Sequence, residues 1–155
     1  TALGMCIKNG IIYGDYMTSY SVMAVKKDGT IYTPAQGLMG KNLLAAGVKD
    51  TYNFGPVLIK DGEAQLPWAE TEKYYPRTAV GMVKPNDYVL LVTDTGRYNG
   101  LNHWDMVNIF KSYGCTYAYN LDGGGSATLY FNGKVMNKLI GNTQRPCADF
   151  LYFTR

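Results

Sequence analysis

The chain has 155 residues, of which 46% are hydrophobic and 17% are charged, and this composition predicts one folded globular domain. Its formal net charge is +3, and its longest basic run, Lys26-Lys27, is too short for the basic stripe that nucleic-acid binding needs. No apolar run is long enough to predict a membrane span.

The first third of the chain is predicted to be β-structure. Apolar runs predict strands at residues 5–8, 11–13, 20–25, 31–32 and 52–59. Asn9-Gly10 separates the first two runs, and tight hairpin turns favour this pair. A short helix is predicted over residues 41–48, ending near Gly47.

The second half of the chain predicts longer elements. Residues 78–83 and 88–93 are apolar throughout much of their length, as expected of strands covered on both faces. A helix is predicted over residues 102–113, because Asn102 can cap its start and Asp105 can complete a capping box. The sequence therefore places a helix directly after a buried strand.

The next strand, residues 116–122, completes a predicted β-α-β unit with strand 88–93 and helix 102–113. Such units are right-handed and join parallel strands. A hairpin around Asn132-Gly133 and a last strand at residues 149–154 follow. Because hairpins and a crossover are both predicted, we expect an α+β fold, a single domain with a mixed β-sheet and flanking helices.

A glycine-rich loop ends the strand at residues 116–122. Asn120 and Asp122 share one face of that strand, at the edge where α/β units bind ligands. The glycines allow positive φ angles and close approach of a ligand, so successive N–H groups could form an anion-binding nest. Ser126 and Thr128 add hydroxyl donors. The loop residues with predicted ligand contacts are Asn120, Gly123, Gly124, Gly125, Ser126 and Thr128. The alternative is a glycine-rich turn that only connects two strands.

Residues 120–128, Asn-Leu-Asp-Gly-Gly-Gly-Ser-Ala-Thr, resemble the hallmark motif of the phosphodiester glycosidase family. Residues 54–62 resemble the central block of that family, and residues 76–81 resemble its arginine block. Gly96-Arg97 and residues 145–149 follow in family order. The resemblance is specific over residues 52–154 and implies a hydrolase that cleaves the glycosidic bond of a sugar phosphodiester, such as one of N-acetylglucosamine.

Two differences from the family pattern shape what we expect of the chain. An upstream Asn-Gly-Gly-Phe-Phe-like segment of the family is not found among residues 1–155, and Thr95 stands where the family tends to have aspartate. We therefore expect residues 1–155 to be one phosphodiester glycosidase-like domain, truncated or processed at its N-terminus, whose site a preceding chain segment completes. The resemblance further implies a bacterial or phage protein that acts outside the cell, at a cell surface or on the phage particle.

Asp122 and Asp94 are the predicted catalytic residues, because glycosidases generally use two carboxyl groups. Asp122 ends strand 116–122, and Asp94 ends the strand predicted over residues 88–93. Alternatively, Asp122 caps the N–H groups of its own glycine turn, and Asp94 is a simple turn residue. His103, the only histidine, argues against a histidine-based triad, and we expect it to be exposed.

Arg77 and Arg97 are predicted to bind the substrate phosphate, because a guanidinium can grip phosphate with two parallel hydrogen bonds. A surface salt bridge is the alternative for Arg77, and Arg145 could equally hold the C-terminal strand. The predicted partner is a carbohydrate or sugar-phosphate ligand. No cofactor and no metal site are predicted, since a divalent cation near Asp122 would lack a ligand cluster and the three cysteines lack metal-binding spacing. A second hypothesis is a non-catalytic module that binds glycan or cell wall.

Overall fold

The computed structural model describes residues 4–66, 73–94 and 100–153. The strands are β1 (Cys6–Lys8), β2 (Ile11–Gly14), β3 (Ser21–Lys26), β4 (Ile31–Tyr32), β5 (Val48–Phe54), β6 (Val57–Lys60), β7 (Glu63–Ala64), β8 (Thr78–Lys84), β9 (Asp87–Val92), β10 (Tyr117–Leu121), β11 (Tyr130–Phe131) and β12 (Lys134–Val135). The helices are α1 (Gly40–Ala45) and α2 (His103–Ser112), and single 3-10 turns lie at Gly124–Ser126 and Ile140–Asn142. None of the helices in these ranges is long and apolar enough to cross a membrane.

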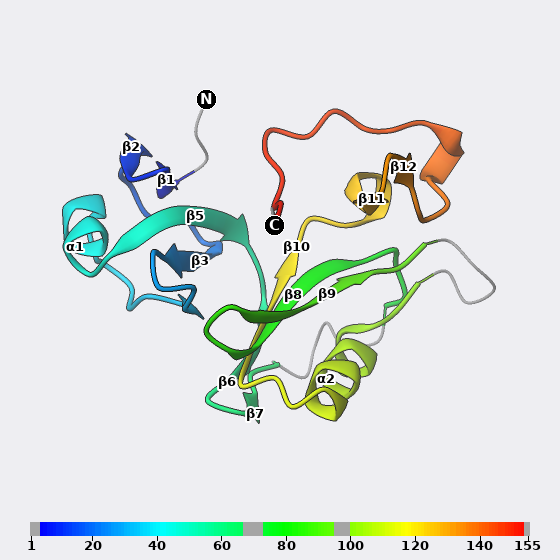
Figure 1. The fold of residues 1–155 in the computed structure, drawn as a ribbon, viewed down its shortest axis with the longest axis horizontal. Helices are drawn as coiled ribbons and strands as arrows, with labels where there is room; N and C mark the ends of the chain where they lie inside the picture. Colours follow the sequence, from blue (N-terminus) through cyan, green and yellow to red (C-terminus); the bar gives the residue numbers. More distant parts are fainter. Residues whose placement is uncertain (1–3, 67–72, 95–99, 154–155) are drawn as a thin grey trace.

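A five-stranded sheet in the order β7-β6-β10-β8-β9 forms the middle layer of the molecule (Figure 1). Helix α2 covers one face, where Met106 and Phe110 pack against Ala79 of β8 and Ala118 of β10. The three-stranded sheet β4-β3-β5 covers the other face. Tyr119 of β10 belongs to the core between the two sheets. The predicted α+β class is confirmed by this arrangement.

The predicted mixed sheet is wrong in its pairing, because every strand pair within the described residues is antiparallel. Strands β9 and β10 do run in the same direction and are joined through α2, as the β-α-β prediction required. However, β8 lies between them and is antiparallel to both. The tight turn at Asn86, whose φ is 64°, folds β9 back onto β8, so β10 pairs with the other edge of β8.

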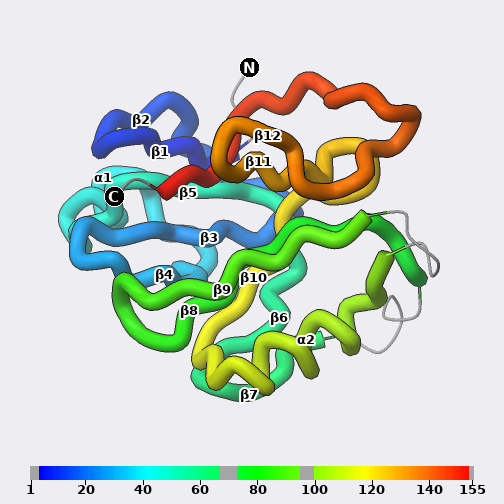
Figure 2. The backbone as a smooth tube through the Cα atoms, turned by 45° about the vertical axis from the view of Figure 1, so that its right-hand side comes forward, coloured from blue at the N-terminus to red at the C-terminus, as the bar shows by residue number. Residues whose placement is uncertain are grey.

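Three element boundaries also differ from prediction. Strand 52–59 is divided at the cis Gly55–Pro56 bond into β5 and β6, which belong to different sheets. The first helix is shorter than predicted, because Val48 already begins β5 and Gly47 adopts a φ of 86°. Residues 149–153 form no strand and instead run as an extended segment beside β5 (Figure 2). This segment is held by a 2.8 Å ion pair between Lys8 and Asp149.

The hydroxyl of Tyr119 joins the two sheets just below the candidate site. It donates a hydrogen bond to the carbonyl of Ser21 (2.6 Å) and accepts one from the N–H of Phe54 (2.8 Å). We expect Tyr119→Phe to lower the free energy of unfolding by about 1–2 kcal/mol, because it leaves the Phe54 N–H without its acceptor. Urea unfolding tests this, with Tyr113→Phe at an exposed position as the control. A loss as small as that of the control would contradict the assignment.

Candidate functional site

Arg77, Asp94 and Asp122 lie at the edge where β8 begins and β9 and β10 end (Figure 1). Thr78 pairs with Leu121 of β10 on one side and with Val92 of β9 on the other. Arg77 precedes β8. Its carbonyl accepts the backbone N–H of Thr93 at 2.9 Å, and its own N–H donates to the side-chain hydroxyl of Thr93 at 2.9 Å. Continuing the register therefore sets Arg77 between the ends that carry Asp94 and Asp122. The backbone thus brings the ends that carry Asp94 and Asp122 to the same edge, and the catalytic roles of these residues remain predictions.

The carboxylate of Asp122 accepts three hydrogen bonds. Oδ1 accepts the N–H of Gly123 (2.9 Å), and Oδ2 accepts the hydroxyl of Ser126 (2.7 Å). Oδ2 also pairs with the Arg145 guanidinium at 3.3 Å, in a contact that leaves both side chains about half exposed. Asp122 thus caps its own glycine turn, as the alternative interpretation expected. It also forms an ion pair with Arg145, which the sequence did not predict.

The glycine loop lies against the residue that precedes Arg77. A Cβ atom on Gly123 would come within 2.5 Å of the Pro76 carbonyl oxygen, which accepts the N–H of Gly124 at 2.8 Å. The N–H of Ser126 bonds to the carbonyl of Gly123 at 2.9 Å. The predicted nest of successive free N–H groups is therefore not formed, because the N–H groups of Gly123, Gly124 and Ser126 each have an acceptor within the protein. The glycines serve close packing here, and their contact with substrate remains a prediction.

Arg77 is a partly buried cation held by carbonyl groups. Nε donates to the carbonyl of Leu101 (3.1 Å), and one terminal nitrogen donates to the carbonyl of Lys73 (3.0 Å). Burial lowers the pKa of Arg77. The guanidinium carbon also lies over the ring of Tyr75, 5.4 Å from its centroid. Within residues 4–66, 73–94 and 100–153, no carboxylate forms an ion pair with Arg77. A guanidinium held by carbonyl groups keeps its positive charge and can attract an anion.

Asn120 is buried beneath the loop and does not line the surface. Its side chain is 1% exposed, and Nδ2 donates to the carbonyl of Gly55 at 2.7 Å. Oδ1 is buried and has no hydrogen-bond partner within the described part of the chain. This amide fixes the segment between β5 and β6 next to β10. Thr128 is half-buried beyond the loop, and Arg97 falls outside the described residues.

Asp94 connects β9 to the segment that follows the glycine loop. Its Oδ2 accepts the backbone N–H of Lys138 at 3.1 Å. Residues 4–66, 73–94 and 100–153 contain no group of three or more His, Cys, Asp or Glu side chains that could hold a metal ion. The catalytic role of Asp94 remains a prediction.

His103 is buried, contrary to the expectation of an exposed side chain, because α2 sets its first residue against the sheet edge. It is 6% exposed, and burial, with a smaller effect of nearby Arg77, lowers its pKa to about 4. The residue pattern gave no indication that this histidine would be buried. The sequence also left the role of Arg145 undecided. The resemblance of residues 145–149 to the family was the signal that this arginine could belong to the site.

The free energy of unfolding should depend on pH through His103. The unfolded chain binds a proton at this histidine near its ordinary pKa of 6.5, whereas the folded chain binds one only near pH 4. We expect stability to be full above pH 6.5 and to fall as pH drops from 6.5 to about 4. Urea unfolding across this window should show a shallower pH dependence for His103→Gln. Equal slopes in the two proteins would contradict the assignment.

An open hollow lies beside the N-terminus of α2 rather than over the glycine loop. It is lined by Tyr74, Gly100, Leu101, Asp105, Asn108 and Ile109. Leu101 is the residue whose carbonyl holds Arg77, so the hollow lies behind the arginine. The side chain of Asp105 completes the capping box with Asn102, as predicted, by accepting the backbone N–H of Asn102.

Comparison with known proteins gives consistent results. A family model described as phosphodiester glycosidase matches residues 1–154. An uncharacterized SPbeta prophage-derived protein of Bacillus subtilis, YomE, is 31% identical over 96% of this chain and 25% of its own length. The mouse N-acetylglucosamine-1-phosphodiester alpha-N-acetylglucosaminidase is 28% identical over 84% of this chain and 29% of its own length. The chain thus spans between a quarter and a third of these relatives.

Two solved structures share the fold. The catalytic domain of zebrafish N-acetylglucosamine-1-phosphodiester alpha-N-acetylglucosaminidase, auto-inhibited by its pro-peptide, matches with a TM-score of 0.73 and 23% identity. The match covers 90% of this chain and 51% of that one. A hypothetical protein from Synechocystis matches with a TM-score of 0.52 and 16% identity, covering 79% of this chain and 32% of that one. These likenesses show a shared architecture.

Proposed function

Because the chain belongs to the phosphodiester glycosidase family, we propose that it hydrolyses the glycosidic bond of a sugar phosphodiester, with N-acetylglucosamine as the sugar. The observation that carries this proposal is the ion pair between Asp122 of the glycine loop and Arg145, close to the partly buried cation of Arg77. A carboxylate suits the anomeric carbon, where positive charge develops. The cations suit the departing phosphate.

The chemistry needs little more than these groups. Water replaces the phosphate at the anomeric carbon, so the products are the free sugar and a phosphate monoester. A phosphate leaves as a stabilised anion and requires less protonation than a sugar hydroxyl does, so electrostatic stabilisation by arginine can take over much of the general-acid role. Asp122 acts as nucleophile or base, and Asp94 is the second carboxyl group where one is required. No organic cofactor enters the reaction.

Substrate binding would release Asp122 for this role. The Arg145 side chain is 58% exposed, and its ion pair with Asp122 is a single contact at 3.3 Å. Surface pairs of this kind contribute only about 0–1 kcal/mol, so an incoming phosphate can compete for the guanidinium. The carboxylate then keeps its bonds from Gly123 and Ser126 and faces the sugar with its charge exposed.

A second function, a non-catalytic glycan-binding module, is favoured by one observation. Both carboxylate oxygens of Asp122 are engaged within the protein, as expected of a residue that only shapes a loop. The prophage-derived relative supports a phage or bacterial setting, in which either function would operate on an extracellular or surface glycan.

Turnover decides between the two functions. The purified protein is incubated with the methyl phosphodiester of α-N-acetylglucosamine 1-phosphate, and released N-acetylglucosamine is measured. We expect saturable release by the glycosidase. Saturable binding by calorimetry without any release would instead establish the binding module.

A further inference from the structure

Residues 127–145, here called the arm, leave the glycine loop and return to it. The hairpin of β11 and β12 belongs to the first half of the arm, and the chain returns through the residues that follow β12 (Figure 2). Asn137 closes its base, since Nδ2 donates to the carbonyl of Ala127 (2.8 Å) and Oδ1 accepts the N–H of Leu129 (2.8 Å). The arm is therefore a built element of the site region rather than a loose connection.

Two further contacts fix the returning half of the arm to the predicted catalytic residues. The backbone N–H of Lys138 donates to Asp94, and the side chain of Arg145 pairs with Asp122. The Arg145 chain also passes over Gly125, where an added Cβ would lie 3.5 Å from the arginine Cδ. A ligand that extends from Asp122 would consequently meet the arm first.

The charge of the arm has one sign. It carries Lys134, Lys138 and Arg145, and residues 127–145 contain no aspartate or glutamate. The whole chain, by contrast, has 15 basic and 12 acidic residues. The arm would therefore attract an anionic polymer, and no aspartate or glutamate within residues 127–145 would repel it.

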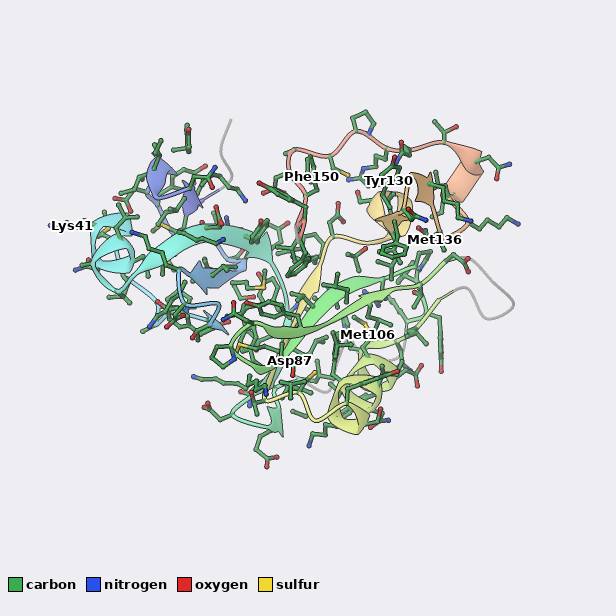
Figure 3. All side chains as sticks on the ribbon, in the orientation of Figure 1. Lys41, Asp87, Met106, Tyr130, Met136 and Phe150 are labelled. Carbon is green, nitrogen blue, oxygen red and sulfur yellow. The ribbon has the colours of Figure 1, made fainter. Side chains whose placement is uncertain are left out.

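Aromatic rings stand out from the same segment. Tyr130 and Phe131 are each 66% exposed, and Figure 3 shows Tyr130 and Met136 on the arm, away from the core. Phe131 pairs directly with Lys134 across the hairpin, so both side chains lie on one face. A ring suits the apolar face of a sugar, and an adjacent ammonium suits a phosphate. This pairing matches a ligand in which sugars and phosphates alternate.

We propose that the arm binds the neighbouring repeat units of a polymeric substrate, an anionic glycan whose sugars are joined through phosphodiesters. The inference rests on the proposed function, because the unit that reacts lies at Asp122. The arm holds the units beyond it, with Lys134 and Lys138 on phosphates and Phe131 on a sugar. The protein therefore acts on polymer in preference to a single unit.

Binding of defined probes tests this. The probes are a phosphodiester-linked tetramer of N-acetylglucosamine 1-phosphate and its single-unit methyl phosphodiester, measured by calorimetry at low salt. We expect the tetramer to bind about 10-fold more tightly, and the double variant Lys134→Ala/Lys138→Ala to lose most of that preference. Lys27→Ala/Lys41→Ala removes the same charge far from the arm and should keep the preference. Figure 3 shows Lys41 at the opposite end of the molecule, and the N–H of Lys27 bonds to Gly47, just after α1. Phe131→Ala should weaken tetramer binding as well.

Three results would overturn the proposal. The first is equal affinity for tetramer and single unit in the wild-type protein. The second is an equal loss in the two double variants, which would indicate a general charge effect. The third is equally tight binding of single-stranded DNA with the same number of phosphates, which would make the arm a nucleic-acid surface. Turnover of the single-unit substrate is read separately, so a failure of the arm proposal leaves the glycosidase proposal standing, and a failure of turnover leaves the tetramer preference measurable.

Discussion

Replacing Asp122 with asparagine is expected to lower kcat at least about 100-fold, the usual contribution of a positioned acid or base. The substitution keeps the size of the side chain and an oxygen that can accept the Gly123 N–H, so the loop should stay in place. It removes the charge that the reacting sugar requires and the partner of Arg145. Steady-state kinetics with a sugar phosphodiester measures the loss, and thermal unfolding confirms that the fold is intact.

Two matched variants separate chemistry from loop structure. Ser126→Ala removes one hydrogen bond to Asp122 but leaves its charge, and should reduce kcat far less. Glu63→Gln neutralises an exposed carboxylate that pairs only loosely with Lys111, at 3.9 Å, and should change nothing. If Asp122→Asn retained wild-type turnover, Asp122 would be only the cap of its glycine turn.

Gly123→Ala should destabilise the protein by about 2 kcal/mol and disable the site, because the new methyl group has no room. Its Cβ would lie 2.5 Å from the Pro76 carbonyl oxygen, which is backbone and cannot rotate away. The loop would have to move off β8, breaking the bond from the Gly124 N–H to that carbonyl. We expect a lower unfolding midpoint in urea and a large loss of turnover.

Gly125→Ala is the control for this prediction. The nearest atom to its Cβ is the Cδ of Arg145, at 3.5 Å, an ordinary contact with a flexible side chain. Its φ angle is not in the left-handed region. This variant should stay close to the wild type in stability. Equal stability of the two alanine variants would show that the Gly123 contact with Pro76 does not constrain the loop.

The strand pattern and the helix caps were predictable because their signals are local. Apolar runs placed β8 and β9 within a few residues, and Asn102 with Asp105 located the start of α2. The order of the strands in the sheet could not be predicted from local signals. The pairing of β10 with the free edge of β8 depends on the turn at Asn86 and on packing between residues far apart in the sequence. The sheet was therefore predicted to be mixed, whereas its observed pairs are antiparallel.

The site was predictable as a location rather than as a set of contacts. The predicted strand ends placed Asp94 and Asp122 at one edge, and the register adds Arg77 between them. The partner of each residue depends on the return path of the chain, so Arg145 on Asp122 and Lys138 on Asp94 could not be read from spacing. The glycine run predicted free N–H donors, whereas the N–H of Gly124 bonds to Pro76 and that of Gly123 bonds to Asp122.

The bond that is broken tests the central claim most directly. Hydrolysis of the N-acetylglucosamine phosphodiester in heavy-oxygen water should place the label on the anomeric hydroxyl of the released sugar, because water or Asp122 attacks carbon. Mass spectrometry of both products reads the position of the label. Label in the phosphate monoester would mean attack at phosphorus, and the protein would then be a phosphodiesterase and not a glycosidase.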